Sequence, residues 1–510
     1  MGVVMVLFVG AGAGYAWYLN HEVHRIPVKG LDTAPTKGVD VNTENILMFG
    51  STSRCALTVQ NPAYGLCTQG VTGVNSDVVM VLHLDPAHRT VSILSIPRDL
   101  FIPNARATTP TQTGANKIDA ALYQGPSQLV AAIEEDFGIP IQHYVELNFD
   151  TFAGVVTALG GITMYFPEPV FDAYSGLNVP TPGCRHLNGV EALQVVRARH
   201  LQYQSPTVTT STPHAWPQES QSDLARIIRD HEFLRVLAAT VAKRGLGNPA
   251  TDLSLVNAVA PQITVDSGLS ATSMVNLVLG YHGVNVGTAP QLTVPVIVGQ
   301  FGSYHFKGGT YGDVEFPTEP QDQSVVDQFL GVTADTNTMA GGRLPSPSSV
   351  RVSVLNGTGA ANQATSTAQA LGTLGFDVVG IGTATPMATE AETVVTYAQR
   401  TPANEAAAQL VARSLSGAVI MAYGPAGGGA QVTVTTGTDF SVNATAPAPP
   451  TTSTTAPEGK KATTTTTGPT TTATAGTTSP SGQFSAPSTP NEALAPWDPR
   501  ACTPGGGEGS

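Results

Sequence analysis

Two groups of charged residues, about a hundred positions apart, carry the residue types that bind a multiply charged anion. In the first group, Arg98 and Asp99 follow Pro97 at the end of a strand-like run. A proline ends the hydrogen-bonded ladder of a strand, so both charged side chains are expected at the rim of a sheet. In the second group, arginine and aspartate recur within residues 197–200 and 223–229. Arginine suits phosphate and aspartate suits a divalent cation, so the pattern predicts a polyanion site with a metal.

The composition makes this local group more informative, because the protein as a whole repels anions. The chain has 510 residues, of which 12% are charged and 41% are hydrophobic, and its net charge is −13. This length suits two or three domains. The lysines and arginines form no block of the kind that general nucleic-acid binding needs, so we expect no nucleic-acid partner.

The first residues have the composition of a membrane segment. Residues 3–19 are uncharged and almost all apolar, and at about 1.5 Å per residue they barely span a hydrocarbon core of about 30 Å. Bulky residues such as Trp17 and Tyr18 end the run, where a signal peptide would carry small residues for cleavage. We expect an uncleaved anchor at residues 1–20, with a cleaved signal peptide as the open alternative. The chain would then be a single-pass protein of the cell membrane, with its bulk extracytoplasmic.

The four cysteines fit an oxidising compartment. Cys55 and Cys67 flank a short loop rich in turn-forming residues, and this spacing predicts a local disulfide rather than a metal site. Cys184 and Cys502 remain. The segment 495–502 contains a tryptophan and resembles a docking segment on a flexible tether, so these two cysteines are candidates for pairing. Two free or intermolecular thiols are the slightly favoured alternative.

Strands and helices alternate along the part of the chain that must position the charged residues. The expected strands are 45–50, 76–84, 91–94 and 144–147, and the expected helices are 128–137, 152–159, 188–197 and 223–243. The last helix carries an apolar face made by Leu224, Ile227, Ile228, His231, Leu234 and Leu237. This alternation predicts an α/β fold with a mixed central β-sheet layered between helices over residues 44–316, preceded by a stalk at 21–43.

The remainder divides into three parts. Residues 317–348 are rich in Pro, Ser, Thr and Gly and are expected to form a linker. Residues 349–440 contain two β-α-β patterns and predict a small α/β domain; its Asn356-Gly357-Thr358-Gly359 turn lacks a phosphate-loop pattern and is read as a plain tight turn. Residues 441–510 are dominated by Thr and Pro and are expected to be a disordered tail.

The motifs together resemble the LytR-CpsA-Psr family. The matching segments, in the family's order, are 45–54, 76–84, 95–99, 116–120, 138–150, 159–162, 187–193, 197–200 and 223–226. Residues 350–440 resemble the small C-terminal domain attached to many actinobacterial members. The resemblance covers most of residues 45–240.

This resemblance implies an extracytoplasmic phosphotransferase. Such an enzyme moves a glycopolymer from a polyprenyl pyrophosphate carrier to peptidoglycan through a phosphodiester bond, with polyprenyl pyrophosphate phosphatase activity as a possible side reaction. Transfer of this kind rests mainly on charge neutralisation and positioning, usually with Mg²⁺. By motif position the catalytic residues are Arg98, Asp99, Arg197, Arg199 and Arg226, the substrate-binding residues are Arg54 and Lys117, and the Mg²⁺ ligands are Asp77 and Asp223. Asp99 is expected to hold Arg98 in an ion pair.

The chain departs from the family pattern at three positions. Thr52 stands where an acid is usual, Asn75 where an arginine is usual, and Asp230 where a glutamine is usual. These changes put one metal-adjacent contact and one phosphate contact in doubt. The remaining arginines and aspartates lead us to expect an active enzyme.

A long lipid carrier also needs an apolar slot. The helices 128–137, 152–159 and 223–243 are candidates to line it, with ordinary core packing as the open alternative. The competing function is a membrane-anchored protein that binds or regulates lipid-linked wall intermediates without turnover. A DNA-binding regulator is disfavoured by the net charge of −13.

Overall fold

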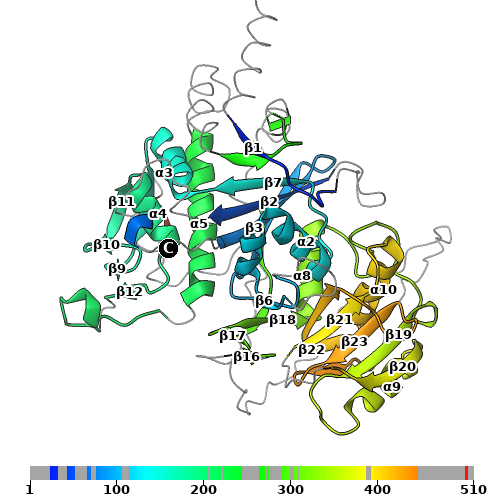
Figure 1. Ribbon diagram of the computed structural model, residues 1–510. Coiled ribbons are helices and arrows are strands. Elements are labelled where there is room, and N and C mark those ends of the chain that lie inside the picture. Colours follow the sequence, from blue (N-terminus) through cyan, green and yellow to red (C-terminus); the bar gives the residue numbers. More distant parts are fainter. Residues whose placement is uncertain are drawn as a thin grey trace, which may run out of the picture.

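The protein is a mixed α/β structure, as the alternation of strands and helices predicts (Figure 1). The computed structural model describes residues 23–32, 43–51, 66–69, 76–105, 114–204, 207–219, 222–243, 263–270, 273–274, 277, 289–298, 304–307, 309–385, 392–445 and 500–502. The expected anchor at 1–20 lies outside these residues, as does most of the tail. The expected stalk at 21–43 is described in part, and its residues 24–26 form a strand of the central sheet, so this part is not a stalk. Within the described residues, the structure contains no helix with the length and apolarity to cross a membrane.

The part of the chain that precedes the C-terminal domain is called the larger body here. Its centre is a seven-stranded sheet in the order β1-β13-β7-β2-β3-β4-β14. Its strands are β1 (His24–Ile26), β2 (Glu44–Ser51), β3 (Ser76–Asp85), β4 (Thr90–Ile96), β7 (His143–Leu147), β13 (Thr264–Asp266) and β14 (Gln291–Thr293). The strand β3 pairs antiparallel with both β2 and β4, and β2 pairs parallel with β7. The sheet is therefore mixed.

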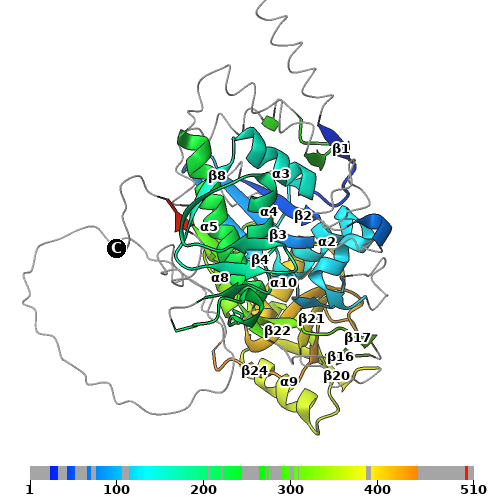
Figure 2. The ribbon, with the colours of Figure 1, turned by 90° about the vertical axis from the view of Figure 1, so that its left-hand side faces the viewer.

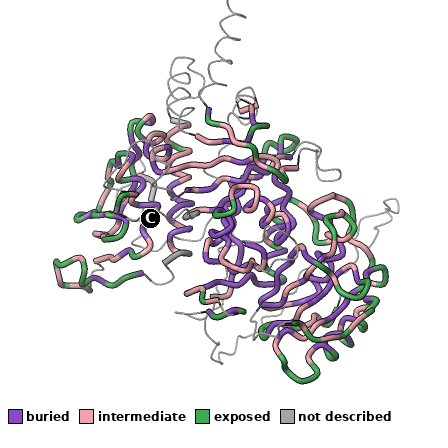
Figure 3. The backbone as a smooth tube through the Cα atoms, viewed as in Figure 1, coloured by how far each residue is buried: buried purple, intermediate pink, exposed green. Residues whose placement is uncertain are grey.

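Alternation along these strands sets the core. Leu47, Val81 and Leu94 stand opposite one another in register and are buried on one face of the sheet. The helix α2 (Pro126–Phe137) covers that face and contributes Leu129, Val130 and Ile133 to the same core. Pro126 begins the helix, and Gly138 ends it in a left-handed conformation that suits glycine. Figure 3 shows buried backbone running through this region.

A second core lies beside the sheet, on the other side of the long helix α5 (Ser222–Lys243) in Figure 1. It is built from α3 (Phe149–Ala158), α4 (Gly189–Arg197) and two small sheets. One sheet has the order β10-β9-β12, and the other has the order β11-β8-β25. The strands are β8 (Ile162–Phe166), β9 (Val170–Asp172), β10 (Leu177–Val179), β11 (Gly183–Leu187), β12 (Gln202–Tyr203) and β25 (Arg500–Ala501).

The end of the chain returns to this second core. The strand β25 pairs antiparallel with β8 at Tyr165 and Met164, and Figure 2 shows it close to α5. A disulfide joins Cys184 of β11 to Cys502, with 5.9 Å between the two Cα atoms. The pairing that the sequence leaves open is therefore present, and free thiols at these two positions are the wrong alternative. Cys67 is also disulfide-bonded, but Cys55 lies outside the described residues, so their pairing stays a prediction.

The C-terminal domain contains the two expected β-α-β patterns. The first is β19 (Arg351–Asn356), α9 (Gln363–Thr373) and β20 (Asp377–Thr383); the second is β21 (Thr393–Tyr397), α10 (Pro402–Ala412) and β22 (Leu415–Tyr423). The strands β23 (Val432–Thr436) and β24 (Phe440–Val442) complete it. The Asn356 side chain accepts hydrogen bonds from the backbone N–H groups of Thr358 and Gly359. That pattern is a local turn closed by its own asparagine.

Residues 317–348 differ from the linker that their composition suggests. They contain most of β18 (Glu315–Glu319) and the helix α8 (Gln321–Leu330), whose Val326 and Phe329 belong to the main core. The strand β18 pairs with β15 (Val296–Val298) on one side and with β22 on the other. One sheet therefore contains strands of the larger body and of the C-terminal domain. The apolar residues of α8 pack against the main sheet. Their burial stabilises a helix in a segment whose Pro and Gly content suggests a linker.

Four further short strands and a short helix lie in the larger body. They are β5 (Phe101–Ile102), β6 (Asn116–Lys117), β16 (His305–Phe306), β17 (Gly309–Thr310) and the 3-10 helix η3 (Ile118–Gln124). Phe101 packs edge-on against Tyr304, Phe306 and Phe316. This aromatic group fixes the chain that directly follows Arg98 and Asp99.

Candidate active site

The Arg98-Asp99 turn leaves the end of β4 at the rim of the main sheet, as the sequence predicts. The backbone carbonyl of Arg98 accepts from the N–H of Asp119 at 3.3 Å, and that of Asp99 accepts from the N–H of Glu315 at 3.0 Å. Two segments far away in the sequence therefore hold this turn by its main chain. The side chains of Arg98 and Asp99 are left to interact with other charged groups.

Asp99 gathers three cations around one carboxylate. Its Oδ1 atom accepts from Lys117 Nζ at 2.7 Å, and its Oδ2 atom accepts from Arg199 Nη2 at 3.1 Å and lies 3.6 Å from Arg98 Nε. Burial alone would raise the pKa of the Asp99 carboxyl, but the charges of Arg98, Lys117 and Arg199 outweigh burial and hold this pKa below its usual value. Four of the residues predicted for the site therefore form one cluster.

The cluster is close to solvent on its cationic side. The side chains of Arg98, Lys117 and Arg199 are 15%, 20% and 28% exposed, whereas that of Asp99 is 10% exposed. One buried anion thus aligns three more accessible cations. An arrangement of this kind suits a ligand that carries several negative charges.

Arg197 and Arg199 approach the site from the end of α4. This helix begins with a capping box, in which Asn188 and Glu191 satisfy each other's backbone N–H groups. It ends at Arg197, whose guanidinium lies 4.5 Å from the centre of the Phe149 ring. The N–H of His200, directly after Arg199, donates to the fully buried Asp172 at 2.8 Å. The segment is therefore fixed on both sides of its two arginines.

An apolar cavity of about 120 Å³ lies next to Arg197. Its wall is formed by β2, β3, the end of β7, α3, α4 and α5, and its charged members are Arg197 and Asp230. The other lining residues are Met48, Phe49, Gly50, Val78, Met80, Leu147, Asn148, Phe149, Phe152, Leu193, Val196, Phe233 and Leu234. The helices α3 and α5, two of the three candidates for an apolar slot, line this cavity. The helix α2 does not, because it packs on the other face of the sheet.

Arg226 and Asp230 lie together on α5. Arg226 is buried, and its Nε atom is 3.9 Å from Asp230 Oδ2. Asp230, the residue that departs from the family pattern, thus faces both this arginine and the apolar cavity. The buried side of α5 is also more polar than the apolar face expected from the sequence, since Arg226, Arg229 and Asp230 share it with Ile227 and Phe233.

The other predicted site residues are not described at the level of the side chain. Arg54, Thr52 and Asn75 lie outside the described residues, and for Asp77 and Asp223 only the backbone is described, in β3 and in the first turn of α5. Among the described residues, no group of three or more His, Cys, Asp or Glu side chains is placed to hold a metal ion. The magnesium ligands therefore stay a prediction.

The sequence analysis includes Arg229 in the charged group 223–229 and His231 in a helix face, but it assigns neither of them a positioning role. Arg229 is buried, donates to Glu219 at 2.6 Å and also donates to the carbonyl of Ala198, between Arg197 and Arg199. His231 Nε2 lies 2.7 Å from Ser95 Oγ and ties α5 to β4. The spacing of Arg226 and Arg229 puts them on one helix face and could have identified Arg229. Glu219 and Asp172 lie outside the motifs, so the sequence carries no comparable signal for them.

Two protein-family models match most of the chain. The model of the LytR_cpsA_psr family matches residues 27–311, and that of the LytR cell envelope-related transcriptional attenuator matches residues 349–440. The chain is 30% identical over 254 residues to the probable cell wall biosynthesis protein LcpB of Corynebacterium glutamicum, covering 49% of this chain and 55% of that protein. It is 38% identical over 138 residues to the polyisoprenyl-teichoic acid–peptidoglycan teichoic acid transferase TagV of Bacillus subtilis, covering 26% of this chain and 34% of that protein.

Among solved structures, the LytR-Csp2A-Psr enzyme from Actinomyces oris aligns with 60% of this chain and 95% of its own, at 22% identity and a TM-score of 0.45. The chain thus spans about half the length of LcpB and a third of that of TagV. The family model, in contrast, matches more than half of the 510 residues and includes the described cation cluster. The chain therefore belongs to the LytR_cpsA_psr family.

Proposed function

We propose that the chain is a phosphotransferase that moves a glycopolymer from a polyprenyl pyrophosphate carrier to peptidoglycan. The observation that carries the proposal is the cluster of Arg98, Lys117 and Arg199 around Asp99, with Arg197 reaching from the same segment to an apolar cavity. A lipid-linked pyrophosphate combines a multiply charged head with an apolar chain. The site offers a matching surface for each part.

The reaction follows from this division. A hydroxyl oxygen of the acceptor attacks the phosphorus that carries the glycopolymer, and the phosphoanhydride bond to the carrier breaks. Polyprenyl phosphate leaves, a phosphodiester forms, and the hydroxyl proton passes to solvent. The cations stabilise the charge that develops on the phosphate oxygens, which is the main requirement of phosphoryl transfer. With water as the acceptor, the same step would give the phosphatase side reaction.

The apolar cavity would hold the first part of the lipid chain. Phe152, Phe233 and Leu234 provide apolar surface, and Arg197 marks the polar end. The carrier is embedded in a membrane, so this assignment agrees with the anchor proposed for residues 1–20 and with an extracytoplasmic site. The membrane and peptidoglycan are accordingly the proposed partners.

Mg²⁺ is proposed as the cofactor, with Asp77 and Asp223 as ligands. Asp99 is a poor candidate, because its carboxylate already contacts three cations. Carboxylate oxygens are the ligands that this hard cation prefers, and the ion would supply further charge neutralisation at the pyrophosphate. Asp77→Asn and Asp223→Asn should each shift the Mg²⁺ activation curve to higher concentration. Curves that coincide with the wild-type curve would remove the metal assignment.

The test is direct transfer in a purified system. The full-length protein, a synthetic polyprenyl pyrophosphate-linked saccharide and a peptidoglycan fragment are combined with Mg²⁺, and the phosphodiester product is detected by mass spectrometry. Product that depends on Arg98 supports the enzyme. Binding of the lipid-linked saccharide with neither product nor released phosphate would favour the non-catalytic binder instead.

A further inference from the structure

A second and larger cavity, of about 720 Å³, lies at the opposite end of β3 from the Arg98-Asp99 turn. Met80 lines the apolar cavity and His83 lines this one. Residues three apart on a strand point to opposite faces of a sheet, so the two cavities lie on different faces. The volume of the larger cavity lies within the range of about 300–1,000 Å³ that is usual for small-ligand sites.

A row of polar residues crosses three strands at this cavity, and two of its members, His83 and Ser92, line the cavity. Asn45, His83 and Ser92 stand opposite one another in β2, β3 and β4, on the face that carries Leu47, Val81 and Leu94 in the next row. The next row is wholly apolar and buried. Ser92 donates to the carbonyl of Phe329 at 2.9 Å, which joins the row to the end of α8. The sheet thus changes from an apolar row to a buried polar row at this point.

The hydrogen bonds of Asn45 fix the protonation of His83. Asn45 Nδ2 donates to the carbonyl of Pro140 at 2.7 Å, so its Oδ1 atom faces His83 Nδ1 at 2.7 Å as an acceptor. Nδ1 therefore carries the proton, and Nε2 is an acceptor. Among the described residues, Nε2 receives no hydrogen bond. Burial lowers the pKa of His83 to about 4, although Asp85 partly opposes this effect, so the ring is neutral at neutral pH.

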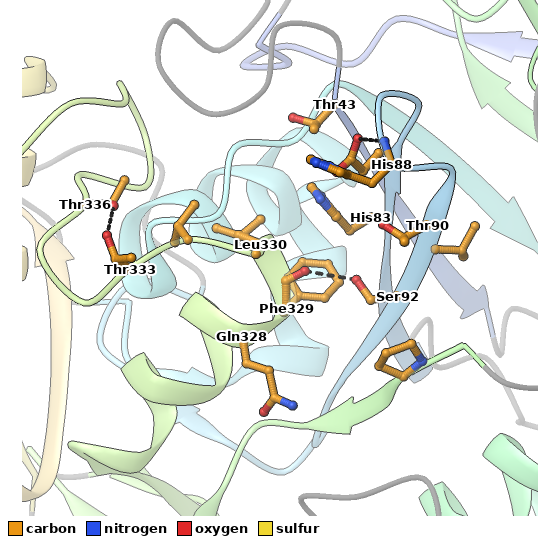
Figure 4. Close-up of a pocket in the computed structure, with 15 residues that line it drawn as sticks. Thr43, His83, His88, Thr90, Ser92, Gln328, Phe329, Leu330, Thr333 and Thr336 are labelled. Carbon is orange, nitrogen blue, oxygen red and sulfur yellow. Dashed lines mark hydrogen bonds and ion pairs between the residues drawn. The ribbon is translucent and has the colours of Figure 1, made fainter. Parts of the chain in front are cut away.

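The rim of the cavity supplies hydroxyl and amide groups, as Figure 4 shows. It includes Thr43, Thr90, Gln328, Thr333 and Thr336, and a hydrogen bond of 2.6 Å joins His88 Nδ1 to Asp85 Oδ2 beside them. Phe329, Leu330 and Val332 add apolar surface. No lysine or arginine is among the lining residues, and one carboxylate is. This lining disfavours phosphates and other anions.

We infer that this cavity binds a neutral saccharide. A sugar presents many hydroxyl groups around faces of C–H bonds, and the cavity presents hydroxyls and an amide around apolar side chains. A sugar hydroxyl would donate to His83 Nε2, which belongs to a residue that lines the cavity and accepts no hydrogen bond from the described residues. The inference concerns a site separate from the cation cluster and does not depend on the transfer reaction.

The position of the cavity gives the site a role at the domain junction. One wall is the end of α8 and the segment 328–336, which leads into the C-terminal domain. A bound saccharide would therefore contact both the main sheet and this segment. The saccharide could be part of the acceptor glycan or of the transferred polymer, which share the neutral, hydroxyl-rich chemistry.

The test uses the full-length protein with three probes. Maltotriose offers hydroxyls alone, chitotriose adds acetamido groups, and inorganic phosphate tests the excluded class. Calorimetry should show saturable binding of at least one trisaccharide, and hydrogen exchange should show protection within 88–92 and 328–336. A preference for chitotriose would point to an acetamido glycan such as the acceptor, and a preference for maltotriose would point to a polymer of simple hexoses.

The variants locate the binding. Gln328→Ala and Thr90→Val change exposed rim residues and should leave the fold intact, and each should weaken binding by about 3- to 10-fold through one lost hydrogen bond. His83→Leu should weaken it further. The matched control is His305→Leu, an exposed histidine on β16, with unchanged affinity. Failure of both trisaccharides to bind, equal affinity in all cavity variants, or competition by phosphate would each overturn the inference.

Discussion

The guanidinium of Arg229 donates a hydrogen bond to the carbonyl oxygen of Ala198, the residue between Arg197 and Arg199. Its Nη1 atom also donates to Glu219 at 2.6 Å, and both of these charged side chains are fully buried. The arginines on either side of Ala198 make different contacts: Arg197 lies over the Phe149 ring, and Arg199 contacts Asp99. A single buried ion pair thus fixes the backbone from which both cations project.

Replacing Arg229 should therefore reduce catalysis without removing a ligand contact. In Arg229→Met/Glu219→Gln, the buried charge pair is removed as a unit, which avoids the large cost of leaving one buried charge alone. We expect kcat to fall by about 10²-fold, because small displacements of positioning groups have effects of this size, while KM for the lipid substrate changes little. Steady-state kinetics of transfer separate the two parameters.

The matched control is Arg235→Met, which removes a partly exposed arginine on the same helix. It should leave kcat unchanged. If the Arg229 double variant lost thermal stability and kept its kcat when assayed below its melting temperature, Arg229 would be a structural residue only.

Arg98→Ala should abolish most transfer while the protein stays folded. A charge-assisted contact to a phosphate in the transition state contributes about 2.7–4 kcal/mol, which is a factor of about 10²–10³ in rate. Arg98 also contributes to holding Asp99 ionised, so Asp99 should show a higher pKa in the variant. Arg351→Ala, at an exposed position of the C-terminal domain, is the control. Parallel losses of activity and melting temperature in Arg98→Ala would argue for a structural role.

Hydrophobic periodicity predicts much of the fold. It does not predict the junction between the main sheet and the C-terminal domain. The bounds of the strands and helices expected between residues 45 and 243 were predicted to within a few residues, because each element carries its own apolar pattern. The linker expectation at 317–348 failed, because the burial of Phe329 and Val326 depends on a distant sheet. The pairing of β18 with β22 was likewise outside the reach of local patterns.

The site, like the fold, was predictable from the sequence only in part. The charged residues Arg98, Asp99, Lys117 and Arg199 were predicted from their motifs, and the structure brings them together. The residues that hold them, Glu219 and Asp172, are ordinary acids in the sequence and acquire their role only through burial. The polar row containing His83 is visible only once the register of β2, β3 and β4 is known.

Filling the apolar cavity should impair the use of long lipid carriers selectively. Leu234→Trp places a larger side chain in a cavity of about 120 Å³. We expect KM for a long polyprenyl substrate to rise by about tenfold or more, since each buried CH₂ that is lost costs about 0.8 kcal/mol. A water-soluble short-chain analogue should react at the wild-type rate. Ala239→Trp, on the exposed side of α5, is the control; equal effects on long and short substrates would place the lipid elsewhere.

Breaking the Cys184–Cys502 disulfide should release the end of the chain from the second core. The strand β25 makes only two residue pairs with β8, so it depends on the covalent link to stay in place. In Cys502→Ser we expect faster hydrogen exchange at Met164 and Tyr165, with the exchange of β2 and β3 unchanged. Non-reducing peptide mapping of the wild type should recover the peptide that joins Cys184 to Cys502. Slow exchange at β8 in the variant would mean that β25 docks without the disulfide.

The junction between α2 and the C-terminal domain should weaken as the pH rises. Burial raises the pKa of the Glu134 carboxyl from 4.5 to about 8; the negative charges of Asp32 and Glu405 add to this effect, and a hydrogen bond from the Ile141 N–H and the charge of Arg400 oppose it. The neighbouring Glu135 pairs with Arg400 across the junction.

The folded-state pKa of Glu134 exceeds the unfolded value, so the native state holds the proton more tightly. Its contribution to stability is complete below about pH 4.5 and is lost as the pH rises through about 8. The melting temperature should therefore fall between pH 5 and pH 8, and Glu134→Gln should flatten this dependence by removing the titrating group. Buried Asp136, whose pKa burial also raises, should leave a residual slope. Asp377→Asn, an exposed carboxyl of the C-terminal domain, is the control, and a slope that is identical in wild type and Glu134→Gln would contradict the assignment.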